Sequence, residues 1–251
     1  MPYKRGRPLL DVSLPFRLAT AMVFYPVWIL AQSINILLYA TGYENTGKLK
    51  GITRAILVSN HTTFLDPVMV SGAVFPRRTW QTLLERTVVS PFLGTFVRLL
   101  GGMPLPPGKS GLDRILASAE TAFRYRRFIH FYPEGECYLY NQKINEFKPG
   151  AFYIAAELDI PVIPLVTVFS EGPFKPYSFW GRSLPKEKMI ALDPVSPSRF
   201  IRRTETGAVC MDSVREFAQG VREIMQREID ARQGSSAFYR GRMERMKGIN
   251  D

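Results

Sequence analysis

The stretch Ala55-Ile56-Leu57-Val58-Ser59-Asn60-His61-Thr62-Thr63-Phe64-Leu65-Asp66-Pro67 decides the fold class that we expect for this 251-residue chain. Its first four residues are aliphatic, which is typical of a buried strand. The residues from Pro67 to Phe75 predict the start of a helix. A buried strand that leads through a short turn into a helix indicates an α/β domain, and the length of the chain suits one such domain with a sizeable core.

The turn between this strand and helix carries a candidate catalytic pair. His61 is one of two histidines in the chain and lies five residues before Asp66. A carboxylate that holds one ring nitrogen protonated leaves the other nitrogen free to accept a proton, so the pair can act as a general base. Asp66-Pro67 is also a good helix N-cap followed by proline at the first helical position. That alternative explains Asp66 but not Asn60-His61, and both interpretations stay open on the residues alone.

Three further segments follow this turn: Phe128-Ile129-His130-Phe131-Tyr132-Pro133-Glu134-Gly135, then Phe147-Lys148-Pro149-Gly150-Ala151, then Ile160-Pro161-Val162-Ile163-Pro164-Leu165. Together with Asn60-His61-x4-Asp66, in this order and at these spacings, they resemble the glycerolipid acyltransferase family, typified by 1-acylglycerol-3-phosphate acyltransferases. The resemblance covers roughly residues 51–169. It implies transfer of a fatty acyl group from a thioester, on coenzyme A or acyl carrier protein, to a lipid hydroxyl.

The residue chemistry is compatible with that reaction. A free alcohol is a poor nucleophile and needs a base within hydrogen-bonding reach. His61 would take the hydroxyl proton, and Asp66 would stabilise the imidazolium that forms. Direct attack on a thioester needs no enzyme nucleophile and no cofactor. A lone histidine with dispersed carboxylates also lacks the usual spacing of metal ligands, so we expect no metal.

The expected acceptor site is less well defined, because the chain departs from the family there. Pro107 and the pair Glu136-Cys137 stand where the family has arginine and Thr-Arg, which bind the acceptor's phosphate. Glu136 would repel a phosphate. Lysines could substitute as point charges, without the bidentate fork of arginine, so the acceptor lipid stays open. The candidate substrate-binding residues are Asn60, Glu134, Gly135, Lys148 and Lys109, although Asn60 also suits a purely conformational role in the turn.

Two other side chains invite alternative roles. Cys137 could form a thioester acyl-enzyme intermediate with His61 as base, or it could be a small residue in a tolerant loop. His130 lies within an alternating strand and is expected to be a core histidine and not a second catalyst. Two cysteines in all, Cys137 and Cys210, do not make a disulfide framework and fit a reducing compartment.

The segment before the expected domain indicates membrane association. Residues 18–40 are long enough to span a bilayer, and no charged residue occurs between Arg17 and Glu44. Pro26 and the polar cluster Gln32, Ser33 and Asn35 interrupt the run, so a bent or re-entrant helix pair fits as well as one span. A two-helix anchor is what the family resemblance implies, and a buried core helix is the remaining alternative. Basic residues on both flanks suit a segment with both ends on the cytoplasmic side of a membrane.

The charge distribution bears on possible partners. The net charge is +11, and residues 1–54 carry seven basic and two acidic side chains. Because this basic region flanks the apolar segment, we expect an anionic bilayer surface as the partner and no nucleic acid. The other expected partners are membrane lipids and the acyl donor.

We therefore predict an α/β fold, a mixed sheet flanked by helices, with an N-terminal membrane-associated helical segment. The expected parts are a membrane-anchoring segment (1–45), a catalytic domain (46–233), and a basic tail (234–251) that contacts the membrane or is frayed. Other classes of protein that fit are a catalytically silent membrane-binding module and an acyl-thioester hydrolase.

The sequence also predicts further elements. An aromatic surface loop is expected over 170–185, and strands are expected over 161–169 and 189–192. Helical spacing is found for Leu112, Ile115, Leu116, Ala119 and Phe123 and for Val214, Phe217, Ala218, Val221, Ile224 and Met225.

Overall fold

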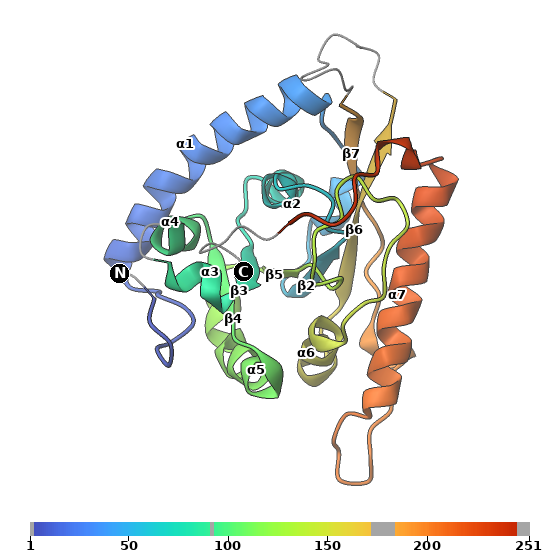
Figure 1. Cartoon of the computed structure of the whole chain (residues 1–251). Helices are drawn as coiled ribbons and strands as arrows, with labels where there is room; N and C mark the ends of the chain where they lie inside the picture. The colour runs from blue at the N-terminus through green and yellow to red at the C-terminus, as the bar shows by residue number, and fades with distance from the viewer. Residues whose placement is uncertain (1–2, 91–92, 172–183, 245–251) are drawn as a thin grey trace.

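The computed structural model describes residues 3–90, 93–171 and 184–244 (Figure 1). A seven-stranded sheet forms its centre, in the order β1-β7-β6-β2-β5-β3-β4. Neighbouring strands are parallel except for β6 and β7, which are antiparallel, so the predicted mixed sheet is confirmed. The strands are β1 (Gly42–Glu44), β2 (Ala55–Ser59), β3 (Trp80–Leu84), β4 (Gly102–Leu105), β5 (Phe128–Phe131), β6 (Val162–Ser170) and β7 (Lys186–Ala191).

Helices cover both faces of this sheet (Figure 1). One face carries α5 (Gly108–Tyr125), α6 (Gly150–Leu158) and α7 (Met211–Ala231). The other face carries α2 (Asp66–Val74) and the short 3-10 helix η1 (Thr46–Leu49). The remaining elements are α1 (Leu14–Tyr39), α3 (Glu85–Val89), α4 (Leu93–Leu99), η2 (Pro197–Arg199) and η3 (Ser236–Phe238).

Strand β2 shows why the sheet forms from these residues. Ile56 and Val58 point into the core under α5, α6 and α7, whereas Leu57 points into the core around α2. All three are fully buried, and burial of one such side chain contributes about 1.5–3 kcal/mol. A strand that is apolar on both faces therefore belongs in the middle of a helix-covered sheet. The helical spacings predicted for α5 and α7 are also confirmed, since Ile115 and Phe217 are fully buried on them.

Helix α1 is a single helix of 26 residues with Pro26 inside it, so the interpretation as a helix pair is wrong for this chain. It is the one helix in the described part of the chain that is long and apolar enough to cross a membrane. Only 17% of its most apolar window is buried, unlike a core helix. The expected aromatic loop lies largely outside the described residues, as does the end of the basic tail.

Candidate active site

The candidate catalytic residues come together at one edge of the sheet, the edge formed by the carboxyl ends of the central strands β2 and β5. Strands β2 and β5 are parallel neighbours, with Val58 opposite Phe131, so the residues that follow them emerge at the same edge. His61 follows β2 and Glu134 follows β5 after only a few residues. Ligands of open α/β sheets usually bind at the carboxyl ends of the strands. The topology therefore places the predicted site where a ligand can reach it.

His61 and Asp66 form the predicted pair. Nδ1 of His61 lies 2.8 Å from Oδ2 of Asp66. The Asp66 side chain is fully buried, whereas 21% of the His61 side chain is exposed. Nε2 of His61 has no hydrogen-bond partner among the residues that the structure describes. The geometry thus leaves Nε2 as the atom that can take a proton from a substrate.

Four donors besides the imidazole hold the Asp66 carboxylate. The backbone N–H groups of Thr62 and Thr63 donate to Oδ2 at 2.6 and 3.0 Å, and their hydroxyls donate to Oδ1 at 3.1 and 2.8 Å. The interpretation of Asp66 as an N-cap is wrong, because the N-cap residue is Leu65 and no side chain caps this helix. The carboxylate faces back to the histidine turn.

Tyr132 supports the other side of the imidazole, a contact that the sequence interpretation missed. The Tyr132 and His61 rings are stacked, with centroids 3.9 Å apart and planes 18° from parallel. The Tyr132 hydroxyl is buried and has no hydrogen-bond partner within residues 3–90, 93–171 and 184–244, so the ring and not the hydroxyl makes the useful contact. The available signal was an aromatic residue directly before Pro133-Glu134.

Glu134 fixes the histidine turn from the neighbouring strand. Its Oε1 accepts the His61 backbone N–H at 3.1 Å, and its Oε2 accepts both the backbone and the side-chain N–H of Asn145. Burial raises the pKa of Glu134, and these donors oppose the shift. The structure thus places Glu134 beside the pair, with one carboxylate oxygen bonded to the His61 turn and the other to Asn145.

Asn60 and the loop after Gly135 complete the support. The Asn60 side chain exchanges two hydrogen bonds with the Thr167 backbone, at 3.0 and 2.8 Å. This pairing supports a conformational role for Asn60. The backbone N–H groups of Tyr138 and Tyr140 donate to the carbonyls of His61 and Thr62. Main-chain bonds therefore hold the turn from β6 and from the loop that follows β5.

The two candidate lysines lie near the same edge. Gly135 has φ +74°, and a β-carbon there would collide with Nζ of Lys148, so glycine allows the ammonium to approach the backbone. Lys148 is exposed and pairs with no carboxylate in the described residues. Lys109 is exposed at the start of α5, which follows the carboxyl end of β4. Both lysines can therefore meet an anionic group that enters from this edge.

Cys137 and His130 do not have the properties of catalysts. Burial, followed by the charges of Asp66 and Glu134, raises the pKa of the Cys137 thiol, which disfavours the thiolate needed for an acyl-enzyme. Burial lowers the pKa of His130 to about 3, so its ring is neutral. Nε2 of His130 lies 2.9 Å from the Ser59 hydroxyl. His130 is a core residue, as predicted, although no described residue bonds to its Nδ1.

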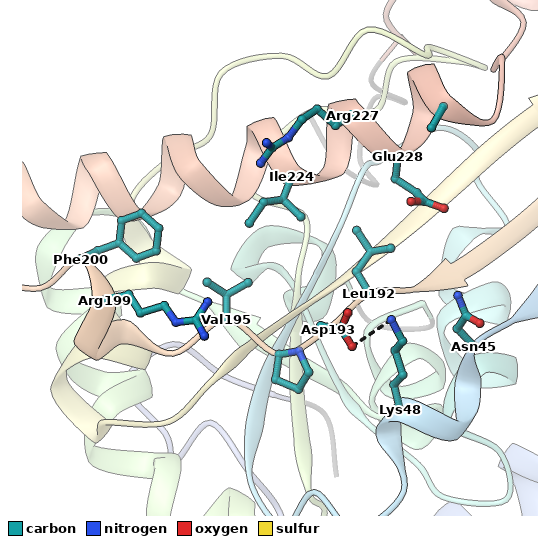
Figure 2. A pocket seen from close by; sticks show the side chains of 12 residues that line it. Asn45, Lys48, Leu192, Asp193, Val195, Arg199, Phe200, Ile224, Arg227 and Glu228 are labelled. Atoms are coloured by element: carbon teal, nitrogen blue, oxygen red, sulfur yellow. Dashed lines mark ion pairs between the residues drawn. The ribbon is translucent and has the colours of Figure 1, made fainter.

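A separate pocket of about 510 Å³ lies away from this site (Figure 2). Lys48, paired with Asp193 at 2.9 Å, lines it together with residues of α7 such as Ile224. Val195, also in its lining, pairs with Val162 at the beginning of β6, whereas His61 follows the end of β2. The pocket is therefore at the opposite edge of the sheet.

Comparison with known proteins gives a consistent match. A family model described as "Acyltransferase" matches residues 40–168. The 1-acyl-sn-glycerol-3-phosphate acyltransferase of Saccharomyces cerevisiae is 29% identical over 82% of this chain, and that of Haemophilus influenzae is 26% identical over 72%. The chain spans 63% of the yeast relative's length and 70% of the bacterial one.

A solved structure shares the fold. The 1-acyl-sn-glycerophosphate acyltransferase PlsC from Thermotoga maritima superposes with a TM-score of 0.61 at 18% identity, and the match covers 90% of this chain and 86% of that one. The residues matched by the family model include His61, Asp66 and Glu134, which the structure brings together at one edge.

Proposed function

This chain belongs to the acyltransferase family, and on that premise we propose that it acylates the hydroxyl of a lysophospholipid in phospholipid biosynthesis or remodelling. The donor would be a fatty acyl thioester, on coenzyme A or acyl carrier protein, and the step uses no cofactor. The observation that carries the proposal is the His61–Asp66 pair, with Nδ1 tied to a buried carboxylate and Nε2 open.

The proposed reaction follows from this geometry. Nε2 of His61 takes the proton of the acceptor hydroxyl while the oxygen of that hydroxyl attacks the thioester carbonyl carbon. Asp66, whose carboxylate also accepts hydrogen bonds from four other donors, stabilises the imidazolium. The tetrahedral intermediate then collapses, the carbon–sulfur bond breaks, and the leaving thiolate takes the proton from His61. The products are an ester and a free thiol.

Helix α1 supports a place at the membrane surface. Its outer face exposes large apolar side chains, among them Met22 (77%), Leu30 and Leu37 (both 64%). Its inner face is fastened to the domain along its length: Tyr25 donates to the Pro76 carbonyl, and Trp28 stacks on Phe75. A helix held in this way suits a position in the plane of the interface, with its outer face in lipid.

The membrane-facing surface would include the catalytic turn. Phe64 lies three residues after His61, and 67% of its surface is exposed. An exposed aromatic ring so close to the base can insert into the bilayer and keep the site at the interface, where both substrates are concentrated. The basic flanks of α1 would face anionic headgroups, in keeping with the cytoplasmic side of a membrane.

A direct assay tests the proposed function. Purified protein in mixed vesicles is incubated with radiolabelled oleoyl-CoA and a panel of lysolipids, and the products are separated by thin-layer chromatography. We expect a diacyl lipid that disappears in the His61→Ala variant. Release of free fatty acid alone would indicate a thioester hydrolase instead. No product from oleoyl-CoA or oleoyl-acyl carrier protein, in a protein that still binds vesicles, would favour a silent membrane module.

A further inference from the structure

The inner face of α1 is polar where its outer face is apolar. Gln32 and Asn35 are both buried there, and Asn35 is fully so. The Gln32 side chain accepts a hydrogen bond from Tyr43, but the Asn35 amide has no partner for its nitrogen or its oxygen among the described residues. A buried amide without partners is costly, and such groups usually meet a ligand or water.

Two more unpartnered polar groups face the same side of the sheet. Glu187 on β7 and Thr167 on β6 are fully buried, and in the part of the chain that the structure describes neither Glu187 Oε1 nor Thr167 Oγ1 has a partner. Thr41 connects Glu187 to α1, because its hydroxyl is 3.1 Å from the Asn35 backbone carbonyl and 3.4 Å from Oε2 of Glu187. We call Asn35, Thr41, Thr167 and Glu187 the α1 polar cluster.

This cluster adjoins the catalytic pair. Burial and then the charge of Asp66 raise the pKa of Glu187 to about 8, so its carboxyl group is mostly neutral at pH 7. Tyr39, at the end of α1, lies with its hydroxyl 3.1 Å from that of Tyr140, whose backbone N–H donates to the Thr62 carbonyl. Thr167 meets the same turn through its backbone bonds to Asn60.

We propose that the α1 polar cluster is a subsite for the uncharged hydroxyl groups of a polyol headgroup on the acceptor lipid. This inference rests on the proposed function. The unpartnered groups are an amide, a hydroxyl and a carboxyl, which can both donate to and accept from an alcohol. No lysine or arginine among the described residues bonds to them, and the nearby Asp66 charge would repel a phosphate. The chemistry thus favours a hydroxyl-bearing group over an anionic one.

Two acceptors that differ only in headgroup hydroxyls test the subsite. Lysophosphatidylglycerol and lysophosphatidylpropanol carry the same charge, the same three-carbon headgroup chain and the same reacting hydroxyl. Wild type is expected to use the first with a KM about five- to tenfold lower, the effect of one or two buried hydrogen bonds. Thr167→Val keeps the shape and removes only a hydroxyl that has no protein partner, so the fold should be retained. Thr167→Val and Asn35→Leu should each abolish the difference in KM between the two lysolipids, because each should raise the KM for lysophosphatidylglycerol alone.

Two controls make the result specific. Ser33→Leu changes a polar residue on the exposed face of α1 and should preserve the KM difference. Calorimetric titration of both lysolipids into the His61→Ala protein measures the same preference without turnover. A wild-type protein that forms no acyl lipid would contradict the proposed function. The dissociation constants from the titration would still test the subsite in that case. Equal affinity of the two lysolipids, or equal weakening of both by Thr167→Val, would overturn the proposed subsite. Ordered water would then be the expected partner of the α1 polar cluster.

Discussion

At the scale of single residues, His61 is held so that only one of its nitrogens is available. Asp66 fixes Nδ1, Tyr132 stacks on the ring, and Glu134 accepts the backbone N–H. A base that is positioned before the substrate arrives does not need to be ordered during the reaction. The rigidity of this turn is therefore part of the proposed chemistry.

Substitutions of the pair should separate chemistry from stability. His61→Ala removes the base, and we expect kcat to fall by about 10²–10⁴-fold with little change in Tm. Asp66→Asn should lower both, because the amide is neutral beside the imidazolium and its nitrogen replaces an oxygen that accepts either the two N–H groups or the two hydroxyls of Thr62 and Thr63, at a cost of about 1–3 kcal/mol. Steady-state kinetics and thermal melts of both variants are the measurement. An Asp66→Asn protein with wild-type Tm would contradict the donor arrangement described above.

Tyr132 offers a matched pair of variants. Tyr132→Phe keeps the ring and removes a buried hydroxyl that has no partner, so kcat should be unchanged and Tm equal or higher. Tyr132→Leu removes the stacking surface under the imidazole, and we expect kcat to fall about tenfold or more through misplacement of the base. The comparison is made on purified proteins with the same acceptor. Equal kcat in the two variants would show that the ring contact is not needed.

The separation of contacts along the chain explains what could be predicted at this scale. His61 and Asp66 are five residues apart and share one turn, so their pairing could be expected from sequence. Asn60 bonds to Thr167, 107 residues away, through a register that only the folded sheet sets. Tyr132 likewise reaches His61 because β2 and β5 are neighbours, which no local pattern indicates.

Glu187 predicts a pH dependence of stability. Its carboxyl has a pKa of about 8 in the folded protein, against about 4.3 when unfolded, so the folded state binds more protons between these values. The free energy of unfolding should therefore fall as pH rises from about 5 to 8, by about 1 kcal/mol per pH unit. Glu187→Gln should reduce this slope and leave only the contribution of groups such as Glu134, whose pKa burial also raises. Denaturant unfolding of both proteins at pH 5, 6, 7 and 8 measures it, and parallel slopes would contradict a neutral Glu187.

At the scale of elements, α1 shows what hydropathy can and cannot predict. An uncharged run is recognisable, but which of its faces meets the domain depends on tertiary packing against α2 and α4. Pro26 did not break the helix, although it suggested a helix pair. Of the polar residues that looked like interruptions, Gln32 and Asn35 are buried on the inner face, whereas Ser33 is exposed.

Charged substitutions on the outer face of α1 should weaken membrane binding. Leu30→Asp with Leu37→Asp removes two exposed leucines, each worth about 1.5–3 kcal/mol when buried in lipid, so partition should fall by about a hundredfold or more. Met211→Asp changes an exposed apolar residue at the start of α7 and is the control. Sedimentation with anionic liposomes in high salt is the measurement. Unchanged sedimentation of the double variant would place the membrane contact elsewhere.

At the scale of the whole molecule, the parallel strands bring distant segments to one edge. The turn after β2, the loop after β5, the start of α5 after β4 and the end of α1 all lie there, whereas the pocket lined by Lys48 lies at the other edge. The expected arginine positions contribute no charge to this edge, since Pro107 is uncharged and Cys137 is buried. Any phosphate recognition there depends on lysines that separate elements supply.

Lys148 is the better placed of these lysines, since its ammonium lies against Gly135 beside the catalytic turn. If it contacts an acceptor phosphate, Lys148→Ala should lower kcat/KM for lysophosphatidic acid about ten- to a hundredfold, the usual value of a charge-assisted contact of 1.5–3 kcal/mol. A zwitterionic lysolipid such as lysophosphatidylcholine interacts more weakly with a single cation, so its kcat/KM should fall less. Lys143→Ala, which removes an exposed lysine in the same loop, is the control. An equal loss with both acceptors would mean that Lys148 supports the loop and does not read the headgroup.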